Sequence, residues 1–139
     1  MNVPNEYLVA ILKFCAVVQI GVAILNLFLP RLLNWHAELK KLSLLPREVF
    51  HVHLWFISLV LLIFGVMTWR FATDIANGSE LIGRWLAASI GLFWGIRTVV
   101  QVTYYSSEHW RGKIPRTIAH VILLGMYFTL SASYIVAAL

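Results

Sequence analysis

The sequence predicts an all-α fold: an integral membrane bundle of four transmembrane helices, with a short amphipathic helix at the membrane interface between the first two. Composition is the first observation, since 60% of the 139 residues are hydrophobic and 12% are charged, roughly half the charged fraction of an average soluble protein. The second is that four apolar stretches reach the ~20 residues that cross a bilayer. The third is that basic residues gather in two of the three connections. The stretches fill most of the chain, so residues 1–139 are expected to form a single transmembrane domain.

The first span is expected over residues 7–29. Glu6 stands where a cleaved signal peptide carries basic residues, and no small-residue cleavage pattern follows Leu29, so the helix is expected to be retained. Pro30 is expected to close it, because proline cannot continue a helical hydrogen-bond ladder. Cys15, the single cysteine, lies within this span and excludes a disulfide or a CxxC pair inside one chain.

The segment 32–44 has a different pattern. Apolar residues recur among charged ones at about helical spacing, which predicts a short amphipathic helix lying on the membrane surface. Asn34 is expected to cap it. The apolar members are Leu32, Leu33, Trp35, Leu39 and Leu42, and the charged ones are Glu38, Lys40 and Lys41.

The remaining spans are expected over residues 49–69, 81–105 and 117–139. The first and last of these three contain no Asp, Glu, Lys or Arg. Pro46 and Pro115 precede them, at positions where the first turn of a helix tolerates proline. Each span is therefore long and apolar enough to cross the bilayer.

Short motifs mark the turn and the packing face of the third span. Asn77 and Gly78 form a typical turn pair, and Ser79 is expected to be the N-cap of the helix that follows. Gly91 and Gly95 form a GxxxG pattern, which brings two helices close together, either within one chain or between chains.

The basic residues predict an orientation. The first and third connections carry an excess of them, whereas the second has two at its helix ends, balanced by Asp74 and Glu80. The positive-inside rule then places the first and third connections in the cytoplasm and both termini outside, in a bacterial inner membrane. Positive charge here indicates topology and a lipid partner, not a nucleic acid. The basic residues are Arg31, Lys40, Lys41 and Arg47, then Arg70 and Arg84, then Arg111, Lys113 and Arg116.

Arg97 is the most informative single residue, because it lies inside an apolar run long enough to span the membrane. A guanidinium at that depth costs roughly 2.5–3.5 kcal/mol on insertion scales, so it normally faces a bundle interior and marks a site or an internal pair. No carboxylate is available within the spans to pair with it. An uncompensated arginine suits a phosphate, a carboxylate or a semiquinone oxygen, although Gln101 and tyrosines also offer purely structural partners.

Polar residues on the four helices are expected to converge in the cytoplasmic half of the bundle. Helical periodicity places several on common faces, and the predicted topology places them at similar depth. They are expected to form a polar ligand pocket that opens towards the cytoplasm. The candidate ligand-binding residues are Asn26, Arg97, Gln101, Tyr104 and His120.

The histidines admit several kinds of chemistry. His51 and His53 diverge on their helix, so only one of them can face His120 at similar depth. Two facing imidazoles can ligate haem b, and with a third ligand they can hold a non-haem metal ion. A histidine beside Arg97 can instead donate to a quinone carbonyl. Histidines at the membrane interface with no special role fit the same pattern.

Four residues resemble positions in the glutathione-dependent MAPEG membrane enzymes. Arg97, Gln101 and Tyr104 are similar to that family's arginine and tyrosine positions on the third helix, and Arg47 precedes the second helix as an arginine does there. The predicted architecture, four spans in 139 residues with outside termini and cytoplasmic loops, is similar to that family as well. The family's Asn and Glu on the second helix are absent, so its thiol chemistry is not implied.

Three classes of function are open at this point. The first is a membrane protein that binds an anionic or redox ligand, namely a quinone, haem, metal ion or lipid. The second is an accessory or assembly subunit of a larger membrane complex. The third is a small oligomeric channel or a MAPEG-like enzyme. The residues do not decide whether any substrate is turned over.

Overall fold

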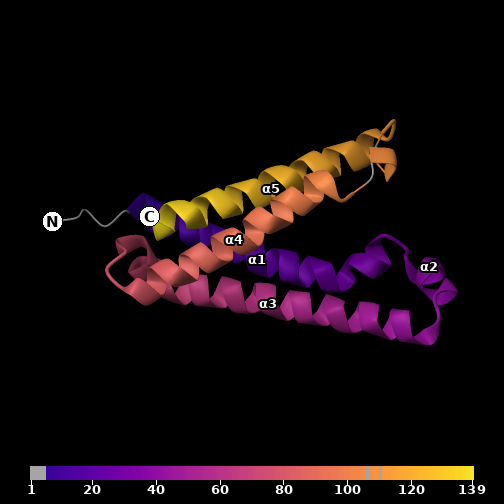
Figure 1. Cartoon of the computed structure of the whole chain (residues 1–139), viewed down its shortest axis with the longest axis horizontal. Helices are drawn as coiled ribbons and strands as arrows, with labels where there is room; N and C mark the ends of the chain where they lie inside the picture. The colour runs from indigo at the N-terminus through magenta and orange to yellow at the C-terminus, as the bar shows by residue number, and fades with distance from the viewer. Residues whose placement is uncertain (1–5, 106, 110) are drawn as a thin grey trace. The chain divides into compact units, whose positions relative to one another are not determined.

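The computed structural model describes residues 6–105, 107–109 and 111–139, and within them the regular elements are helices without a strand. Four helices are long and apolar enough to cross a membrane, which confirms the predicted fold class (Figure 1). In chain order the elements are α1 (Glu6–Leu32), α2 (His36–Lys41), α3 (Leu44–Asn77), α4 (Leu81–Thr103), the 3-10 turn η1 (Ser107–His109) and α5 (Ile114–Ala138).

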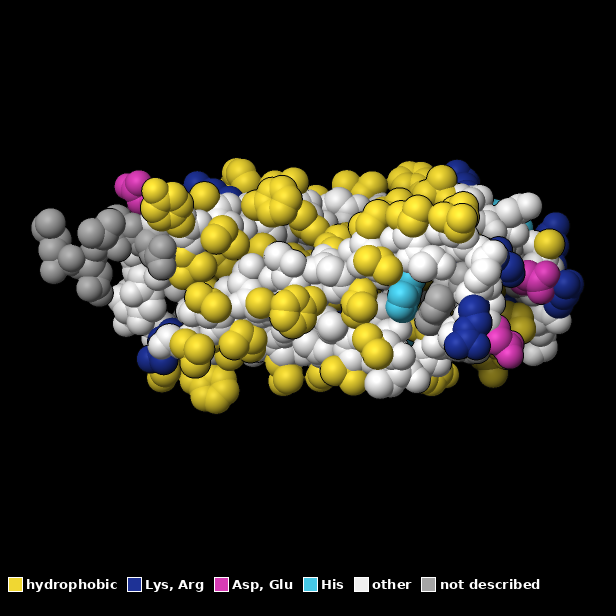
Figure 2. All heavy atoms as spheres, turned by 90° about the horizontal axis from the view of Figure 1, so that it is seen from above, with side chains coloured by type: hydrophobic (Ala, Val, Ile, Leu, Met, Phe, Trp, Pro, Cys, Tyr) yellow, Lys and Arg dark blue, Asp and Glu magenta, His cyan; other side chains and the backbone are white. Residues whose placement is uncertain are grey.

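Large apolar side chains are exposed along the spanning helices, as expected where lipid replaces water. On α4, Leu92, Ile96 and Val99 recur at helical spacing and are 61%, 55% and 59% exposed. Figure 2 shows hydrophobic side chains over much of the visible surface. A water-soluble protein rarely exposes such a continuous apolar face, so contact with the lipid bilayer follows from the fold.

The α1–α2 connection differs from the prediction in two details. Pro30 does not end α1, which continues to Leu32. Asn34 has a left-handed backbone (φ 54°) and terminates α1, because the Trp35 N–H donates to the Pro30 carbonyl at 2.9 Å and the Asn34 N–H to the Arg31 carbonyl at 3.2 Å. This is the Schellman arrangement, in which Asn is one of the few side chains tolerated. The predicted capping of the following helix by Asn34 is therefore wrong.

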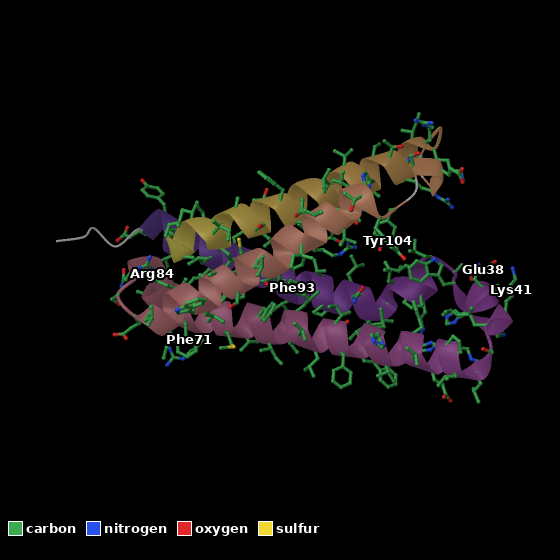
Figure 3. All side chains as sticks on the ribbon, in the orientation of Figure 1. Glu38, Lys41, Phe71, Arg84, Phe93 and Tyr104 are labelled. Atoms are coloured by element: carbon green, nitrogen blue, oxygen red, sulfur yellow. The ribbon has the colours of Figure 1, made fainter. Side chains whose placement is uncertain are left out.

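The predicted short helix is present as α2, and two of its charged side chains form an ion pair. Lys41 Nζ donates to Glu38 Oε1 at 2.8 Å across one turn (Figure 3). Leu39 is the buried apolar residue of this helix. The location of α2 on the membrane surface stays a prediction.

Helix α3 is longer than its apolar core. It begins at Leu44 and ends at Asn77. The helical backbone therefore continues beyond the predicted span 49–69 into polar sequence. At Phe71 the backbone departs from helical geometry (φ −110°, ψ 17°), which marks a kink. Gly78 then turns the chain with φ 59°. The next N-cap is Glu80 and not Ser79, and its side chain makes no capping hydrogen bond.

Two compact units can be described separately. One comprises Met1–Leu12 and Phe71–Leu139, and the other comprises Lys13–Arg70. The expectation of one transmembrane domain stays a prediction.

In the first unit, α4 and α5 pack as an antiparallel pair (Figure 1). The glycines of the GxxxG pattern face α5: a Cβ built on Gly91 would lie 3.2 Å from the Ile135 backbone N, and one on Gly95 would lie 3.1 Å from Ser131 Oγ. Ser131 Oγ in turn donates to the Gly91 carbonyl at 2.8 Å. The pattern thus serves packing within one chain.

The hydroxyl of Ser131 offers a measurable test of this pair. Ser131→Ala is expected to lower the free energy of unfolding by about 0.6 kcal/mol, the average for an interhelical hydrogen bond in a membrane. Ser133→Ala is the matched control, because its hydroxyl donates only to Thr129 of the same helix, at 2.8 Å. Unfolding in mixed micelles compares the two variants, and equal losses would contradict the interhelical assignment.

In the second unit, α1 and α3 run antiparallel with close backbone approach. A Cβ on Gly65 would lie 3.0 Å from the Ala16 carbonyl oxygen. At one end of the pair Lys13 Nζ lies 5.5 Å from the centre of the Trp69 ring, a cation–π contact that helps hold an ammonium at the edge of the apolar region. At the other end the Trp35 and Phe50 rings meet edge-on, with centroids 6.1 Å apart.

Candidate functional site

Three polar side chains of α4 and α5 form a continuous hydrogen-bonded chain. Arg97 Nη1 donates to Gln101 Oε1 at 3.0 Å, since residues four apart share one face of α4. Gln101 Nε2 lies 2.9 Å from His120 Nδ1 on α5. Gln101 is only 6% exposed. A buried amide thus connects the guanidinium to the imidazole.

The direction of each hydrogen bond in this chain is determined by the guanidinium. Because Arg97 can only donate, Gln101 must present its oxygen to it, and its NH₂ group then faces His120. The Nδ1 atom of His120 therefore accepts, and the neutral ring carries its proton on Nε2. The arrangement makes His120 a hydrogen-bond donor at Nε2.

Aromatic rings hold the Arg97 guanidinium from the sides. Its Cζ atom lies 4.8 Å from the centroid of Tyr127 and 5.6 Å from that of Tyr105. Tyr127 also stacks on Trp94, with centroids 5.3 Å apart and an interplanar angle of 24°. Trp94 and Arg97 are one turn apart on α4, so both contact the same ring from α5. Cation–π contacts strengthen when they are removed from water, and they orient the guanidinium in advance of any ligand.

The cluster lies near one end of the helix pair. Gln101 is two residues and Arg97 six residues before the end of α4 at Thr103, or roughly 3 and 9 Å at the helical rise per residue. His120 is six residues after Ile114, where α5 begins. The cluster therefore lies within about two turns of the end of α4, close to one end of the α4–α5 pair.

Tyr104 does not join the chain, although it belongs to the predicted set. It is the C-cap of α4 and is 81% exposed (Figure 3). Its ring meets Tyr105 edge-on, with centroids 6.0 Å apart. Tyr105 and Tyr127, which contact Arg97, lie outside the predicted set. The sequence does contain an indication of Tyr127: it follows His120 by seven residues, which puts both side chains on one face of α5.

Asn26, His51 and His53 lie in the Lys13–Arg70 unit, and each forms a hydrogen bond within that unit. Asn26 Nδ2 donates to Ser58 Oγ across the α1–α3 pair at 3.3 Å. His51 Nδ1 and His53 Nδ1 lie 2.7 Å and 2.9 Å from the carbonyls four residues earlier in α3. A carbonyl only accepts, so both rings carry a proton on Nδ1. Their convergence with Arg97 stays a prediction.

His51 and His53 present different exposure. His51 is half-buried and His53 is exposed, as expected for residues that diverge around a helix. Among the described residues no group of three or more His, Cys, Asp or Glu side chains could hold a metal ion. The haem and metal assignments of these histidines therefore stay predictions that no contact in the described residues supports.

Comparison with protein-family models, with curated proteins and with solved structures finds no match for this chain. The likeness to MAPEG enzymes thus stays a resemblance in a few residues. The hydrogen-bonded series Arg97–Gln101–His120 and the aromatic rings around it are the features of this protein that bear on its function.

Proposed function

We propose that this membrane protein binds an amphipathic ligand whose head group presents an anionic or carbonyl oxygen, of the quinone or acidic-lipid type. The observation that carries the proposal is the hydrogen-bonded chain from Arg97 through Gln101 to His120. Arg97 would hold the oxygen that carries negative charge. The Nε2–H of His120 would donate to a second oxygen of the same head group.

Charge balance supports an anionic partner. Neither α4 nor α5 contains an Asp or a Glu, and within the described part of the chain no carboxylate forms an ion pair with Arg97. Gln101 neutralises none of the charge, because an amide is only a dipole. An arginine in a low-dielectric region without a counter-ion attracts an anion more strongly than it does in water, and its planar fork matches two oxygens of one ligand.

The proton arrangement favours an oxygen ligand over a metal or haem at His120. A histidine that ligates iron or zinc presents an unprotonated nitrogen to the metal. In the chain described above, Nδ1 is engaged by Gln101 and Nε2 carries the proton. Oxygen acceptors suit that donor, whereas metal binding would require the chain to be rearranged.

The proposal includes an orientation. The third connection carries Arg111, Lys113 and Arg116, and the first connection is also basic. The positive-inside rule supports a cytoplasmic location for both. The Arg97 site would then lie in the cytoplasmic leaflet of a bacterial inner membrane, and a ligand could enter sideways from the lipid.

The decisive test measures ligand binding with Gln101→Glu. A carboxylate can still accept from Arg97, and it can accept from His120 once the imidazole proton moves to Nδ1, so the fold is expected to survive. The new negative charge cancels that of Arg97. Binding of decylubiquinone and of phosphatidic acid, each to protein in phosphatidylcholine nanodiscs, is expected to weaken at least tenfold, or about 1.4 kcal/mol. The quinone and the acidic lipid are measured separately, which distinguishes the two sources of oxygen.

Thr98→Val is the matched control. Its hydroxyl donates to the Trp94 carbonyl of the same helix at 2.8 Å and takes no part in the chain, so binding is expected to be unchanged. Arg97→Gln should lose binding as Gln101→Glu does. Saturable binding of neither probe to the wild-type protein, or undiminished binding to Arg97→Gln, would refute the proposed function and leave Arg97 a structural residue.

A further inference from the structure

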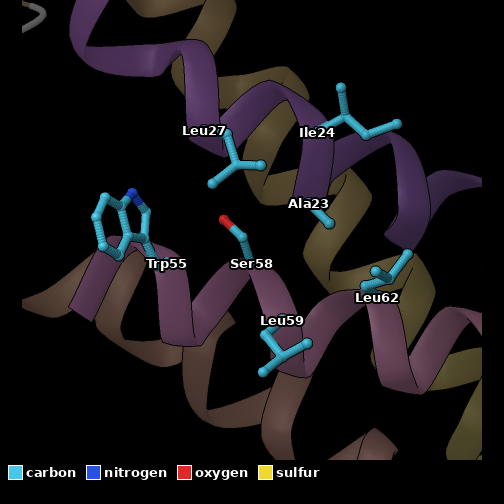
Figure 4. Close-up of a pocket in the computed structure, with 7 residues that line it drawn as sticks. All are labelled: Ala23, Ile24, Leu27, Trp55, Ser58, Leu59 and Leu62. Atoms are coloured by element: carbon cyan, nitrogen blue, oxygen red, sulfur yellow. The ribbon is translucent and has the colours of Figure 1, made fainter. Parts of the chain in front are cut away.

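A second site lies in the Lys13–Arg70 unit, where α1 and α3 leave an apolar hollow of about 220 Å³ (Figure 4). The hollow is smaller than the roughly 300–1,000 Å³ typical of pockets for drug-sized ligands. Its one polar lining side chain, Ser58, has its hydroxyl engaged with Asn26 and with the Leu54 carbonyl. The hollow thus offers an apolar surface to a small ligand or to part of a larger one. Its apolar lining on α3 consists of Trp55, Leu59 and Leu62.

The hollow opens on the part of the unit that would face lipid. Trp55 is 61% exposed and Leu59 is 49% exposed. Both lie on a helix that is long and apolar enough to span the membrane. The material that surrounds such side chains in a bilayer is acyl chain, and a hollow of about 220 Å³ suits part of a single chain.

Basic residues lie at one end of the same helix pair. Arg31 is in the last turn of α1 and Arg47 is in the first turn of α3. Lys40 lies in α2 between them. Among the described residues none of these three cations is paired with a carboxylate, whereas Lys41 is paired with Glu38 at 2.8 Å. Three unpaired positive charges at the end of an apolar hollow complement an anionic head group.

The spacing along the helix matches one leaflet. Trp55 follows Arg47 by eight residues and Leu62 follows it by fifteen, which correspond to roughly 12 and 22 Å of helix. One leaflet contributes about 15 Å of hydrocarbon, or about 20–22 Å when its head groups are included. A phosphate held at the level of Arg47 would therefore place its acyl chain alongside Trp55 and the hollow. The contact between Trp35, the N-cap of α2, and Phe50 of α3 links the α1–α2 connection to the start of α3.

We infer that the α1–α3 hollow is a binding site for one anionic phospholipid, with an acyl chain against Trp55 and Leu59 and the phosphate near Arg31 and Arg47. This site is independent of the Arg97 site, because it lies in the other unit and shares no residue with it. The site is expected to bind a lipid with a negatively charged head group in preference to the zwitterionic lipids of the bulk membrane.

Quenching of Trp55 fluorescence by lipids brominated on the acyl chain tests the inference. The wild-type protein is placed in phosphatidylcholine vesicles with increasing brominated phosphatidylglycerol, or with brominated phosphatidylcholine as the comparison. The signal lost in Trp55→Phe isolates Trp55 from the other tryptophans. Half-maximal quenching of Trp55 is expected at a several-fold lower mole fraction of the anionic lipid. Equal quenching of the Trp55 signal by the two lipids would overturn the inference. If Trp55→Phe does not fold, equal quenching of the total tryptophan fluorescence of the wild-type protein would do the same.

Two variants test the two halves of the site. Arg31→Gln with Arg47→Gln is expected to abolish the preference for the anionic lipid. The matched pair Lys113→Gln with Arg116→Gln removes the same charge from the other basic connection and is expected to retain it. Leu59→Phe adds bulk at the hollow and should reduce quenching by either lipid. Equal loss of the preference in both double variants would show a general effect of protein charge and would refute a localised site.

Discussion

Gly65→Leu is expected to destabilise the protein by about 3 kcal/mol, the upper range for overpacking a tight interface. A Cβ at this position would lie 2.6 Å from Ile20 Cγ1 and 3.0 Å from the Ala16 carbonyl oxygen. Ile20 can shift its side chain only in part, and the carbonyl belongs to the backbone of α1. The two helices must therefore separate, with loss of the dispersion contacts that hold membrane helices together in the absence of a hydrophobic driving force.

Gly21→Leu is the control for this substitution. Gly21 lies on α1 in the same unit, and a Cβ there meets nothing within 4 Å. A leucine at that position would extend into lipid and add helix propensity, so stability is expected to be unchanged or slightly higher. The free energy of unfolding in mixed micelles of dodecyl sulfate and a mild detergent compares the two variants. A Gly65→Leu protein as stable as Gly21→Leu would show that α1 and α3 are not in close contact.

Gln101→Leu is expected to cost about 2 kcal/mol of stability. Hydrogen bonds to charged groups contribute roughly 1.5–3 kcal/mol, more than neutral ones. The substitution removes the acceptor of Arg97 and the donor to His120 together. Arg97 and His120, both half-buried, would then each lose the hydrogen bond to Gln101, and partly desolvated polar groups are costly to leave with fewer hydrogen bonds. This loss distinguishes Gln101→Leu from Gln101→Glu, which retains an acceptor for Arg97.

A double-mutant cycle tests whether the hydrogen bond between Gln101 and His120 contributes to stability beyond the packing of the two side chains. If Gln101 acts through His120, the loss in Gln101→Leu should be smaller when His120→Phe is already present, by at least 0.5 kcal/mol, the coupling expected for residues in contact. Thr98→Val again serves as the control on the same helix. Additive losses for Gln101→Leu and His120→Phe would mean that the two side chains are energetically independent and that the chain carries no coupling.

The four spanning helices could be predicted because their signal is composition, which lipid imposes on every residue of a span. The ends of these helices were predicted less well. Hydropathy places the end of the third helix correctly to within a few residues, but it ends the second at residue 69, although α3 continues to Asn77. Backbone hydrogen bonding continues into polar sequence wherever nothing interrupts it. A hydropathy pattern detects the bilayer and says little about the helix outside it.

The sequence identified Asn34 as a capping residue but assigned it to the wrong helix end. Asn34 was expected to begin a helix, yet its left-handed conformation ends the preceding one. Asn is favoured at both positions, since its short side chain tolerates left-handed backbone and also accepts from N–H groups. A single sequence does not distinguish the two when helices follow one another within a few residues.

The polar chain could be predicted for the residues that lie within regular helix. Arg97 and Gln101 are four apart on α4, so their contact follows from helical geometry alone. The match to His120 depended on the depth of each residue along its helix. Tyr104 is the C-cap of α4 and its side chain is 81% exposed, and its role in ligand binding stays a prediction. Cation–π contacts with Tyr105 and Tyr127 depend on ring orientation, which periodicity does not specify.

The packing of Gly91 and Gly95 against α5 also bears on self-association. Helices α4 and α5 are joined by a connection of ten residues, from Tyr104 to Lys113, so each meets the other at an effective concentration in the millimolar range. A second copy of the chain, at ordinary membrane density, competes poorly for the same glycine face. We therefore expect any homo-oligomer of this protein to use other helix surfaces, and substitutions at the GxxxG pattern to act on monomer folding before they act on assembly.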